Sequence, residues 1–287
     1  MSMTDRLRSL LPARFRERPP VVAVIRLAGV IAPGGSPLRG PNLNLAGLAG
    51  PIERAFSIKG VKAVALVINS PGGSPVQSAL ISARIRQFAA EKKVPVIAFT
   101  EDVAASGGYW LALAADEIYA DENSIVGSIG VVSAGFGFPG LLDKLGIERR
   151  VHTAGEEKAL LDPFRPEREE DIARLKELQG DIYDSFKAHV QDRRGDRLKT
   201  RRGKEIFSGR VWTGRKALAL GLIDGIGELR GEMRRRYGEK VKLRLIGGEK
   251  SWLRRRMGLA GSGGAEALVD AVMARLEARL HWARFGL

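Results

Sequence analysis

The run Ala63-Val-Ala-Leu-Val-Ile-Asn-Ser-Pro-Gly-Gly-Ser-Pro75 carries the pattern from which the fold follows. Its first six residues are apolar and Asn69 ends the run, which predicts a buried strand over residues 63–69. Two adjacent glycines between prolines then indicate a turn. Pro75 opens an amphipathic helix over 75–90, with apolar residues at 81, 85 and 88. A buried strand followed directly by a helix is the repeating unit of an α/β fold.

The same unit recurs along the chain. The apolar pattern predicts strands over 21–31, 94–100 and 117–120, and a short buried helix over 106–115. A long helix is predicted over 166–190, because an apolar stripe follows an acidic first turn that complements the helix dipole. Such alternation of strands and helices predicts an α/β fold with a mainly parallel sheet.

Composition limits the class of protein. A chain of 287 residues with 44% hydrophobic content has enough apolar residues for a globular core, as one large domain or two small ones. The absence of cysteine excludes a disulfide framework, a thiolate metal site and a cysteine nucleophile. The 47 basic and 33 acidic residues give a net charge of +14, which favours an anionic partner. The basic run at 193–204 contains no aromatic residue, so we expect a solvated loop or helix face there and no nucleic-acid binding.

The two ends differ from the region between them. Residues 1–20 form a basic leader, and residues 247–287 form a basic tail with a glycine-rich joint and an amphipathic helix. The domain itself is expected over 21–246. No signal peptide is recognised and no apolar run reaches the roughly 20 residues that span a bilayer, which predicts a cytoplasmic protein. The basic ends leave peripheral contact with an anionic membrane open, although we expect the tail helix to pack on the domain or pair with another subunit.

A serine and a lysine are the candidates for chemistry. A serine hydroxyl is a poor nucleophile until a base takes its proton, and that base is usually a histidine and less often a desolvated lysine. His152, His189 and His281 fall in a strand end, a charged helix and a terminal helix, and none lies in a glycine-rich loop. Lys158, 52 residues after Ser106, is the alternative base.

The surroundings of Ser106 suit a nucleophile. It follows a predicted strand and begins a helix, where free N–H groups stabilise negative charge, and Gly107-Gly108 keep the approach open. A plain N-cap serine accounts for the same pattern. The loop at Gly72-Gly73 offers N–H groups to an oxyanion or another anion, but an ordinary strand-to-helix turn explains it as well.

The surroundings of Lys158 are mixed. Residues 149–153 read as a strand before it, and the apolar residues of 159–164 could remove its amine from water, as a lysine base needs. Glu156 and Glu157 act the other way, because nearby carboxylates favour the charged amine. An ordinary surface lysine is the simpler interpretation.

Four motifs in one order narrow these alternatives. The chain resembles the signal peptide peptidase A family of serine proteases from about residue 21 to residue 229. The matching stretches are Asn69-Ser-Pro-Gly-Gly73, Ala105-Ser-Gly-Gly-Tyr109, Val126-Gly-Ser-Ile-Gly-Val131, and Gly155-Glu-Glu-Lys158 followed by Pro163-Phe-Arg-Pro166. Phe207-Ser-Gly-Arg-Val-Trp-Thr-Gly214 and Ala219-Leu-Gly-Leu-Ile-Asp224 look like the family's closing motif.

The resemblance implies a ClpP/crotonase-like fold built from repeated strand-strand-helix units, with a Ser/Lys dyad and neither a cofactor nor a metal. It makes Ser106 the nucleophile, Lys158 the general base and Ser128 the hydroxyl that orients the lysine. The implied oxyanion-hole amides belong to Gly73 and Gly107, with Gly72 and Gly108 as the alternatives. Members of this length form rings whose active sites combine groups from neighbouring protomers, so Lys158 is expected to serve either its own Ser106 or that of another copy.

The implied activity is endopeptidase cleavage of extended, largely apolar peptides, such as signal-peptide remnants or membrane-protein fragments. Typical members carry an N-terminal membrane anchor, and none is recognised here, which puts the signal-peptide role in doubt while leaving the chemistry intact. Two other classes stay open. A crotonase-like acyl-CoA enzyme would reuse the Gly72-Gly73 loop without the dyad, and a catalytically silent scaffold would form a ring without hydrolysing peptides.

Overall fold

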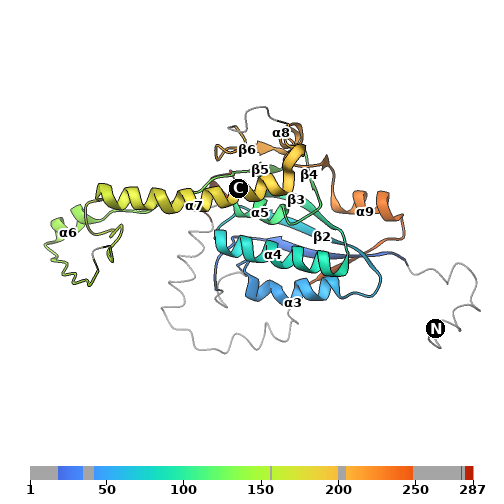
Figure 1. Cartoon of the computed structure of the whole chain (residues 1–287), viewed down its shortest axis with the longest axis horizontal. Helices are drawn as coiled ribbons and strands as arrows, with labels where there is room; N and C mark the ends of the chain where they lie inside the picture. The colour runs from blue at the N-terminus through green and yellow to red at the C-terminus, as the bar shows by residue number, and fades with distance from the viewer. Residues whose placement is uncertain are drawn as a thin grey trace, which may run out of the picture.

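An eight-stranded sheet forms the centre of the chain (Figure 1). The computed structural model describes residues 19–34, 42–155, 157–199, 205–247, 279 and 282–286. In chain order the elements are β1 (Val21–Ala28), α3 (Leu45–Phe56), β2 (Val61–Ser70), α4 (Pro75–Lys92), β3 (Val96–Ala105), α5 (Gly107–Ala112), β4 (Glu117–Ala120), β5 (Ile125–Gly127), α6 (Pro139–Leu145), α7 (Glu169–Arg194), the 3-10 turn η1 (Gly195–Arg197), β6 (Val211–Thr213), α8 (Gly214–Leu220), β7 (Gly225–Ile226), α9 (Leu229–Tyr237) and β8 (Lys242–Ile246).

The sheet is mainly parallel, as the sequence predicts. Its main order is β6-β5-β3-β2-β1-β8, with β4 beside β3 and β7 beside β4. The pair of β5 and β6 is antiparallel, and the other pairs described are parallel. Most of the predicted strands and helices that fall in the described residues exist, several with shifted ends: β3 runs five residues further than expected, to Ala105, and α7 covers residues 169–194 in place of 166–190. The longer β3 ends directly before Ser106.

Both faces of the sheet are covered, which explains why β1, β2 and β3 read as near-continuous apolar runs. One face packs against α3, α4 and α5 in a core that includes Leu66, Ile81 and Leu111. The other face forms a smaller core in which Val24 and Phe99 surround Met233 of α9. Because the strands are held from both sides, their carboxyl ends form a rigid edge on which loops can be placed.

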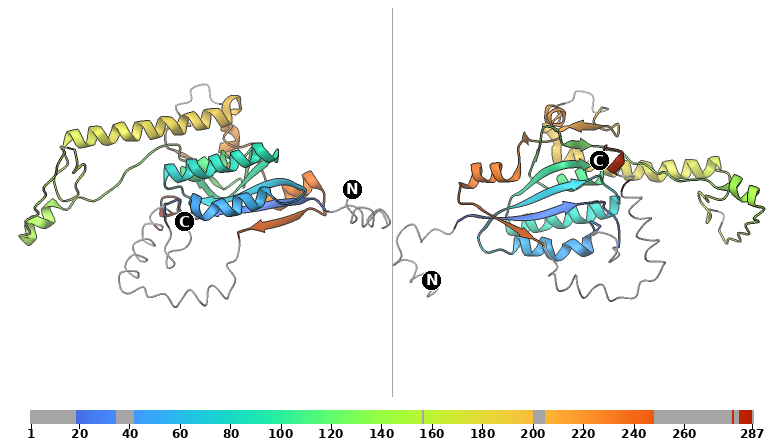
Figure 2. Two further views of the ribbon diagram at one scale, coloured as in Figure 1. Left: turned by 60° about the horizontal axis from the view of Figure 1, so that its bottom comes forward. Right: turned by 180° about the vertical axis from the view of Figure 1, so that it is seen from behind.

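One part of the molecule projects away from the sheet. Residues 132–178, which we call the arm, comprise α6, a long loop and the first part of α7, and they extend to one side of the body (Figures 1 and 2). The arm carries many of the exposed large apolar side chains in the described residues, including Val132, Phe136, Leu145 and Ile147, which are 66%, 79%, 61% and 53% exposed. An apolar surface of this kind is typical of a protein contact site.

The other end of α7 is anchored by arginines. Arg193 donates to the carbonyls of Leu113 and Ala115 at 2.8 and 2.9 Å, and Arg194 is 3% exposed and donates to Asp224 at 2.8 Å. The expectation of a solvated basic run is therefore wrong for these two arginines, because acceptors from distant parts of the chain surround them. Residues 200–204 of that run lie outside the described residues.

Other expectations have different outcomes. Residues 149–153 form no strand, because they lie in the arm and have no described strand beside them to pair with. His189 lies in α7 as predicted. The leader up to residue 18 and nearly all of the tail from residue 248, with His281, lie outside the described residues. Among the helices that are described, none is both long and apolar enough to cross a membrane.

The contact between Arg194 and Asp224 gives a test of the anchor. Burial by itself raises the pKa of the Asp224 carboxyl, but hydrogen bonds from Arg194 and from the Ile118 amide outweigh it and leave the pKa below its ordinary value. A depressed pKa in the folded state contributes stability above the unfolded value, near pH ~4, that is lost as the pH falls through the folded pKa.

We therefore expect Asp224→Asn to lower the free energy of unfolding by about 3 kcal/mol at pH 7, because it leaves the Arg194 charge buried without its partner. The difference from wild type should shrink in urea unfolding measured below about pH 4. Glu122→Gln, which removes the exposed partner of Arg215, is the control and should cost less than about 1 kcal/mol. Equal losses from the two substitutions would contradict the anchoring role.

Candidate active site

Ser106 occupies a strained turn between β3 and α5. Its φ of 51° and ψ of −120° are rare for a residue with a side chain and cost on the order of 1–3 kcal/mol. It stands at the N-cap position of α5, but among the described residues its hydroxyl makes no capping hydrogen bond. Plain N-capping therefore does not explain this serine. The turn holds a half-buried hydroxyl at the carboxyl edge of the sheet.

Ser128 lies next to this turn. The Ser106 amide donates to the Gly127 carbonyl at 2.8 Å, which continues the pairing of Ala105 with Gly127 between β3 and β5. Ser128 also has a left-handed backbone, with φ at 54°, and its amide donates to the Arg210 carbonyl at 2.7 Å. The two serines thus follow the paired ends of neighbouring strands, and each is fixed by a backbone hydrogen bond.

The Gly72-Gly73 loop packs directly against the Ser106 turn. A Cβ on Gly72 would lie 2.9 Å from the Ser106 Cβ, and one on Gly73 would lie 2.0 Å from the Ile31 carbonyl oxygen. Both glycines also have positive φ, at 106° and 138°. A side chain at Gly72 would push the loop away from Ser106, and one at Gly73 would push it away from Ile31. Glycine is needed at both positions because other backbone and side-chain atoms lie so close, which an ordinary turn would not require.

Two amides face the space beside this turn. The Ile31 amide donates to the Gly72 carbonyl at 2.8 Å, and the Ile31 carbonyl accepts from the Ser74 amide at 2.7 Å. The Gly73 amide lies between these two groups and therefore points away from Ile31. Gly107 is the first residue of α5, where an N–H has no acceptor within the helix. A Cβ on Gly107 would lie 3.4 Å from the Gly73 nitrogen, so the two peptide groups are neighbours.

The other two glycines have different surroundings. The Gly72 amide already donates to the Ser70 hydroxyl at 3.2 Å. A Cβ on Gly108 would lie 2.4 Å from the Ser70 carbonyl oxygen, so Gly108 allows α5 to pack closely on the end of β2. The geometry therefore favours Gly73 and Gly107 over Gly72 and Gly108 as donors to a ligand.

Lys158 is not beside Ser106. It lies exposed in the arm, where its amide donates to the Gly155 carbonyl at 3.3 Å. Its neighbour Glu157 pairs with Arg174 of α7 at 2.8 Å, and this hydrogen bond lowers the pKa of the Glu157 carboxyl. Within the single chain, the apolar residues that follow Lys158 leave it exposed, in agreement with the simpler interpretation of a surface lysine.

Positions along α7 show how far Lys158 lies from Ser106. Arg174, beside Lys158, precedes Phe186 by twelve residues, a rise of about 18 Å along a helix. Phe186 stacks on Trp110 of α5 with ring centroids 4.7 Å apart, so it marks the level of the Ser106 turn. The chain thus brings Ser106, Ser128, Gly73 and Gly107 together and holds Lys158 away from them.

Sequence reasoning missed two residues that support the site. The Asn69 side chain donates to Asp102 at 2.5 Å and accepts from the Val103 amide at 3.3 Å, so it ties the ends of β2 and β3 together. Tyr109 is fully buried and donates to the Leu222 carbonyl at 2.7 Å, and burial raises the pKa of its hydroxyl. Both residues belong to the motifs that resemble the family, and this was the only sequence signal that could have pointed to them.

Comparison with known proteins assigns the chain to a family. The model of peptidase family S49 matches residues 88–243, which is more than half of the sequence. A Brucella abortus (strain 2308) protein named Na(+)/H(+) antiporter NhaA is 52% identical over 98% of this chain. The chloroplastic serine protease SPPA of Arabidopsis thaliana is 35% identical over 72% of it. The chain spans 39% of the length of the Brucella protein and 31% of the Arabidopsis protein.

A solved structure agrees on the fold. A lysine-to-alanine mutant of the membrane-bound stomatin-specific protease 1510-N, in complex with a substrate peptide, aligns with a TM-score of 0.51 and 15% identity. The alignment covers 84% of this chain and 97% of that one. The chain, with its mainly parallel sheet, has this ClpP/crotonase-like fold. The chain belongs to peptidase family S49.

Proposed function

We propose that this chain is a serine endopeptidase whose nucleophile is Ser106 and whose general base, Lys158, is supplied by a neighbouring copy. The observation that carries the proposal is the strained Ser106 turn, with the Gly73 and Gly107 amides beside it. A hydroxyl held next to free backbone donors is the arrangement that acyl transfer requires. Membership of family S49 supports peptidase chemistry.

The reaction follows from these groups. The neutral Lys158 amine takes the Ser106 proton while the serine oxygen attacks the peptide carbonyl, and the Gly73 and Gly107 amides hold the resulting oxyanion. As the intermediate collapses, Lys158 protonates the departing amine and an acyl-enzyme remains. A water molecule, deprotonated by Lys158, then attacks the ester and releases the acid and the free serine. Ser128, beside Ser106, orients the lysine amine by accepting its hydrogen bond.

The position of Lys158 supports the shared site. Within one chain the arm holds it about 18 Å along α7 from the level of the Ser106 turn. The exposed apolar side chains of the arm, including Phe136, Leu141 and Leu145, need a covering surface. A second copy of this chain meets both needs, because its body would cover the arm and receive Lys158. Repetition of that contact around an axis closes a ring.

The substrates we propose are extended, largely apolar peptides, for which the relatives give partial support. The 1510-N protease is named as stomatin-specific and membrane-bound, and the Arabidopsis relative is named as a serine protease. The antiporter name belongs to a Brucella protein of which this chain matches 39%. We base the proposal on the S49 match, because that match lies within residues 88–243 of this chain itself.

The dyad is tested by single substitutions. We expect Ser106→Ala and Lys158→Ala each to lower peptide hydrolysis by at least about 10³-fold, because each removes a group that acts on the reacting atoms. Lys176→Ala, at an exposed lysine of α7 within the arm, is the matched control and should keep wild-type activity. The assay is turnover of a fluorogenic peptide panel.

Two results would decide against the dyad. Unchanged turnover in Ser106→Ala would favour a crotonase-like acyl-CoA enzyme that uses the oxyanion loop alone. Assembly of the wild type without hydrolysis of any peptide at any pH would favour a silent scaffold.

Mixing the two inactive variants tests the shared site. In a one-to-one mixed assembly about a quarter of the sites would join an intact Ser106 to an intact Lys158 of the neighbour, so we expect activity up to about a quarter of wild type. The measurement is peptide turnover after subunit exchange, which is followed by mass spectrometry of the assemblies. No recovery despite proven exchange would place both residues of the dyad in one chain.

The arm is tested by placing a charge on it. We expect Phe136→Glu to dissociate the assembly in sedimentation velocity and to abolish turnover at the same time, because an apolar interface does not accommodate an unpaired carboxylate. The control is Leu245→Glu, at a side chain 56% exposed on the edge strand β8, which should change neither. Dissociation of the Phe136 variant with full activity would show that one copy suffices.

A further inference from the structure

Six exposed lysines lie along one edge of the sheet. The neighbouring strands β8, β1, β2 and β3 are parallel, so their amino ends and the turns that lead into them lie side by side. The lysines stand in or next to three of these turns: Lys59 and Lys62 at β2, Lys92 and Lys93 at β3, and Lys240 and Lys242 at β8. We call this group the lysine edge.

The strand register brings these lysines close together. Val21 pairs with Val61 and with Lys242, so β1, β2 and β8 begin at one level. The Val64 amide donates to the Pro95 carbonyl at 2.9 Å, which places the turn before β3 beside the start of β2. Neighbouring strands lie about 4.8 Å apart, so the four strand ends together span about 15 Å. Residues 1–18, which contain five arginines, join the chain at this edge.

Acids do not balance the charge of the lysine edge. Within the part of the chain that the structure describes, none of the six lysines forms an ion pair. Several carboxylates at and beside the edge already have arginine partners: Asp116 with Arg86, Glu117 with Arg236, and Glu239 with Arg234. Glu53 and Glu91 are the remaining described acids of these turns. The edge therefore carries a positive charge that the chain itself leaves largely unneutralised.

The nature of this charge favours a lipid surface over a nucleic acid. A group of about four to eight basic residues on one surface binds anionic lipid headgroups, and lysine interacts with them as a point charge. Nucleic-acid sites add arginine forks that read base edges and exposed aromatic rings that stack on bases. The aromatic residues that adjoin these turns, Phe56 and Tyr237, pack into the two cores instead.

We propose that the lysine edge docks the protein on a bilayer that contains anionic lipids. β3 has ten residues and runs from this edge to the Ser106 turn, so the candidate active site lies about 33 Å from the edge and faces away from the lipid. The end of the body that carries α9 also faces away from the arm, so docking leaves the arm free (Figures 1 and 2). The inference goes beyond the proposed peptidase function and does not require it.

Charge removal at the edge tests the docking. The full chain is co-sedimented with phosphatidylcholine vesicles that contain about one-third phosphatidylglycerol. Each basic residue near such a surface strengthens binding by about fivefold, so we expect the double variant Lys62→Gln with Lys242→Gln to bind at least about 20-fold more weakly than wild type.

A second double variant is the matched control. Lys176→Gln with Lys216→Gln removes two exposed lysines of α7 and α8, so its net charge equals that of the first variant. Charges in solution act over only about 10 Å, so we expect this control to weaken vesicle binding by less than about twofold. Equal weakening by the two variants would show that net charge alone attracts the vesicles, and would overturn the docking surface.

Salt and a competing polyanion separate the kinds of partner. We expect vesicle binding to fall steeply between about 0.05 and about 0.5 M salt and to be absent on pure phosphatidylcholine. Binding that ignores either change would contradict a contact made by exposed lysines. A DNA of about 20 nucleotides that binds more tightly than the vesicles, and loses affinity in the Lys62 and Lys242 variant, would make the edge a nucleic-acid surface instead.

The orientation on the bilayer gives a readout that net charge does not affect. The chain has no cysteine, so one introduced thiol carries a fluorophore alone. Ser57→Cys lies in the turn after α3 at the lysine edge, and Ser208→Cys lies in the loop before β6, beside Gly130 at the other end of the sheet; both positions are exposed. We expect a lipid with a quencher on its headgroup to quench the label at 57 and to spare the label at 208. Equal quenching of both labels, or stronger quenching at 208, would contradict the docking.

The docking and the peptidase function fail separately. Vesicle binding is measured with Ser106→Ala as well as with wild type, and we expect the two to bind alike because Ser106 lies at the opposite edge. Docking at the lysine edge without turnover of any peptide would leave this inference standing and count against the proposed function alone. Peptide turnover by a chain that does not bind anionic vesicles would overturn this inference alone.

Discussion

The close approach of backbone to backbone at the ends of β2 and β3 is the constraint on which the site depends. Gly108 allows α5 to lie against the Ser70 carbonyl, and Gly72 allows its loop to lie against Ser106. With a side chain at either glycine, the two loops would separate and the amides of Gly73 and Gly107 would no longer be neighbours. The two-sided core matters because it holds the strand ends still enough for this contact to persist.

The sequence predicted the loops at Gly72 and Ser106 well, because the residues that indicate them are neighbours in the chain. A strand, a glycine pair and a helix start stand next to one another around both Gly72 and Ser106, so turn chemistry alone places them at the same sheet edge. The parallel order of the strands then brings the two loops together. The positive φ of Ser106 and Ser128 had no such local signal, because serine does not favour it and only the surrounding contacts impose it.

What the sequence missed depends on contacts between distant segments. Arg194 reads as one more charge in a basic run, and its burial follows from Asp224 and the Gly221 carbonyl, which accept its hydrogen bonds. Residues 149–153 have the composition of a strand but no described neighbour, since they lie in the arm. The place of Lys158 was equally unpredictable, because an isolated Gly-Glu-Glu-Lys run carries no information on which copy of the chain it faces.

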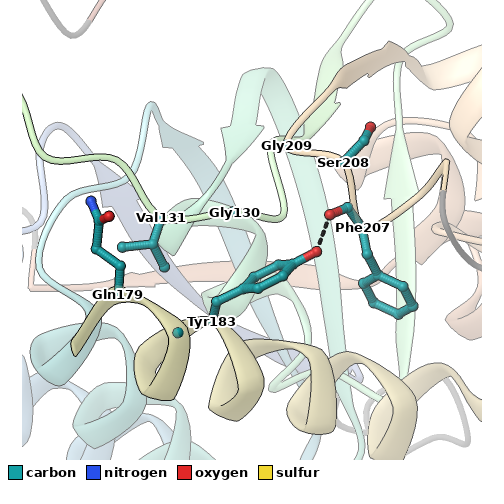
Figure 3. Close-up of a pocket in the computed structure, with 8 residues that line it drawn as sticks. Gly130, Val131, Gln179, Tyr183, Phe207, Ser208 and Gly209 are labelled. Carbon is teal, nitrogen blue, oxygen red and sulfur yellow. Dashed lines mark hydrogen bonds between the residues drawn. The ribbon is translucent and has the colours of Figure 1, made fainter. Parts of the chain in front are cut away.

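The helix α7 connects the features that the proposals use. It has Arg174, which holds the Lys158 loop, near its outer end, Tyr183 hydrogen-bonded to the Phe207 carbonyl in its middle (Figure 3), and Arg194 buried in the body at its inner end. A helix of 26 residues is about 39 Å long and bends little, so these three places keep fixed distances from one another. On the proposed mechanism, a single copy then has a formed oxyanion site but lacks a base. Assembly would therefore switch on hydrolysis, because the base arrives on the neighbour's arm at an oxyanion site that is already formed within each copy.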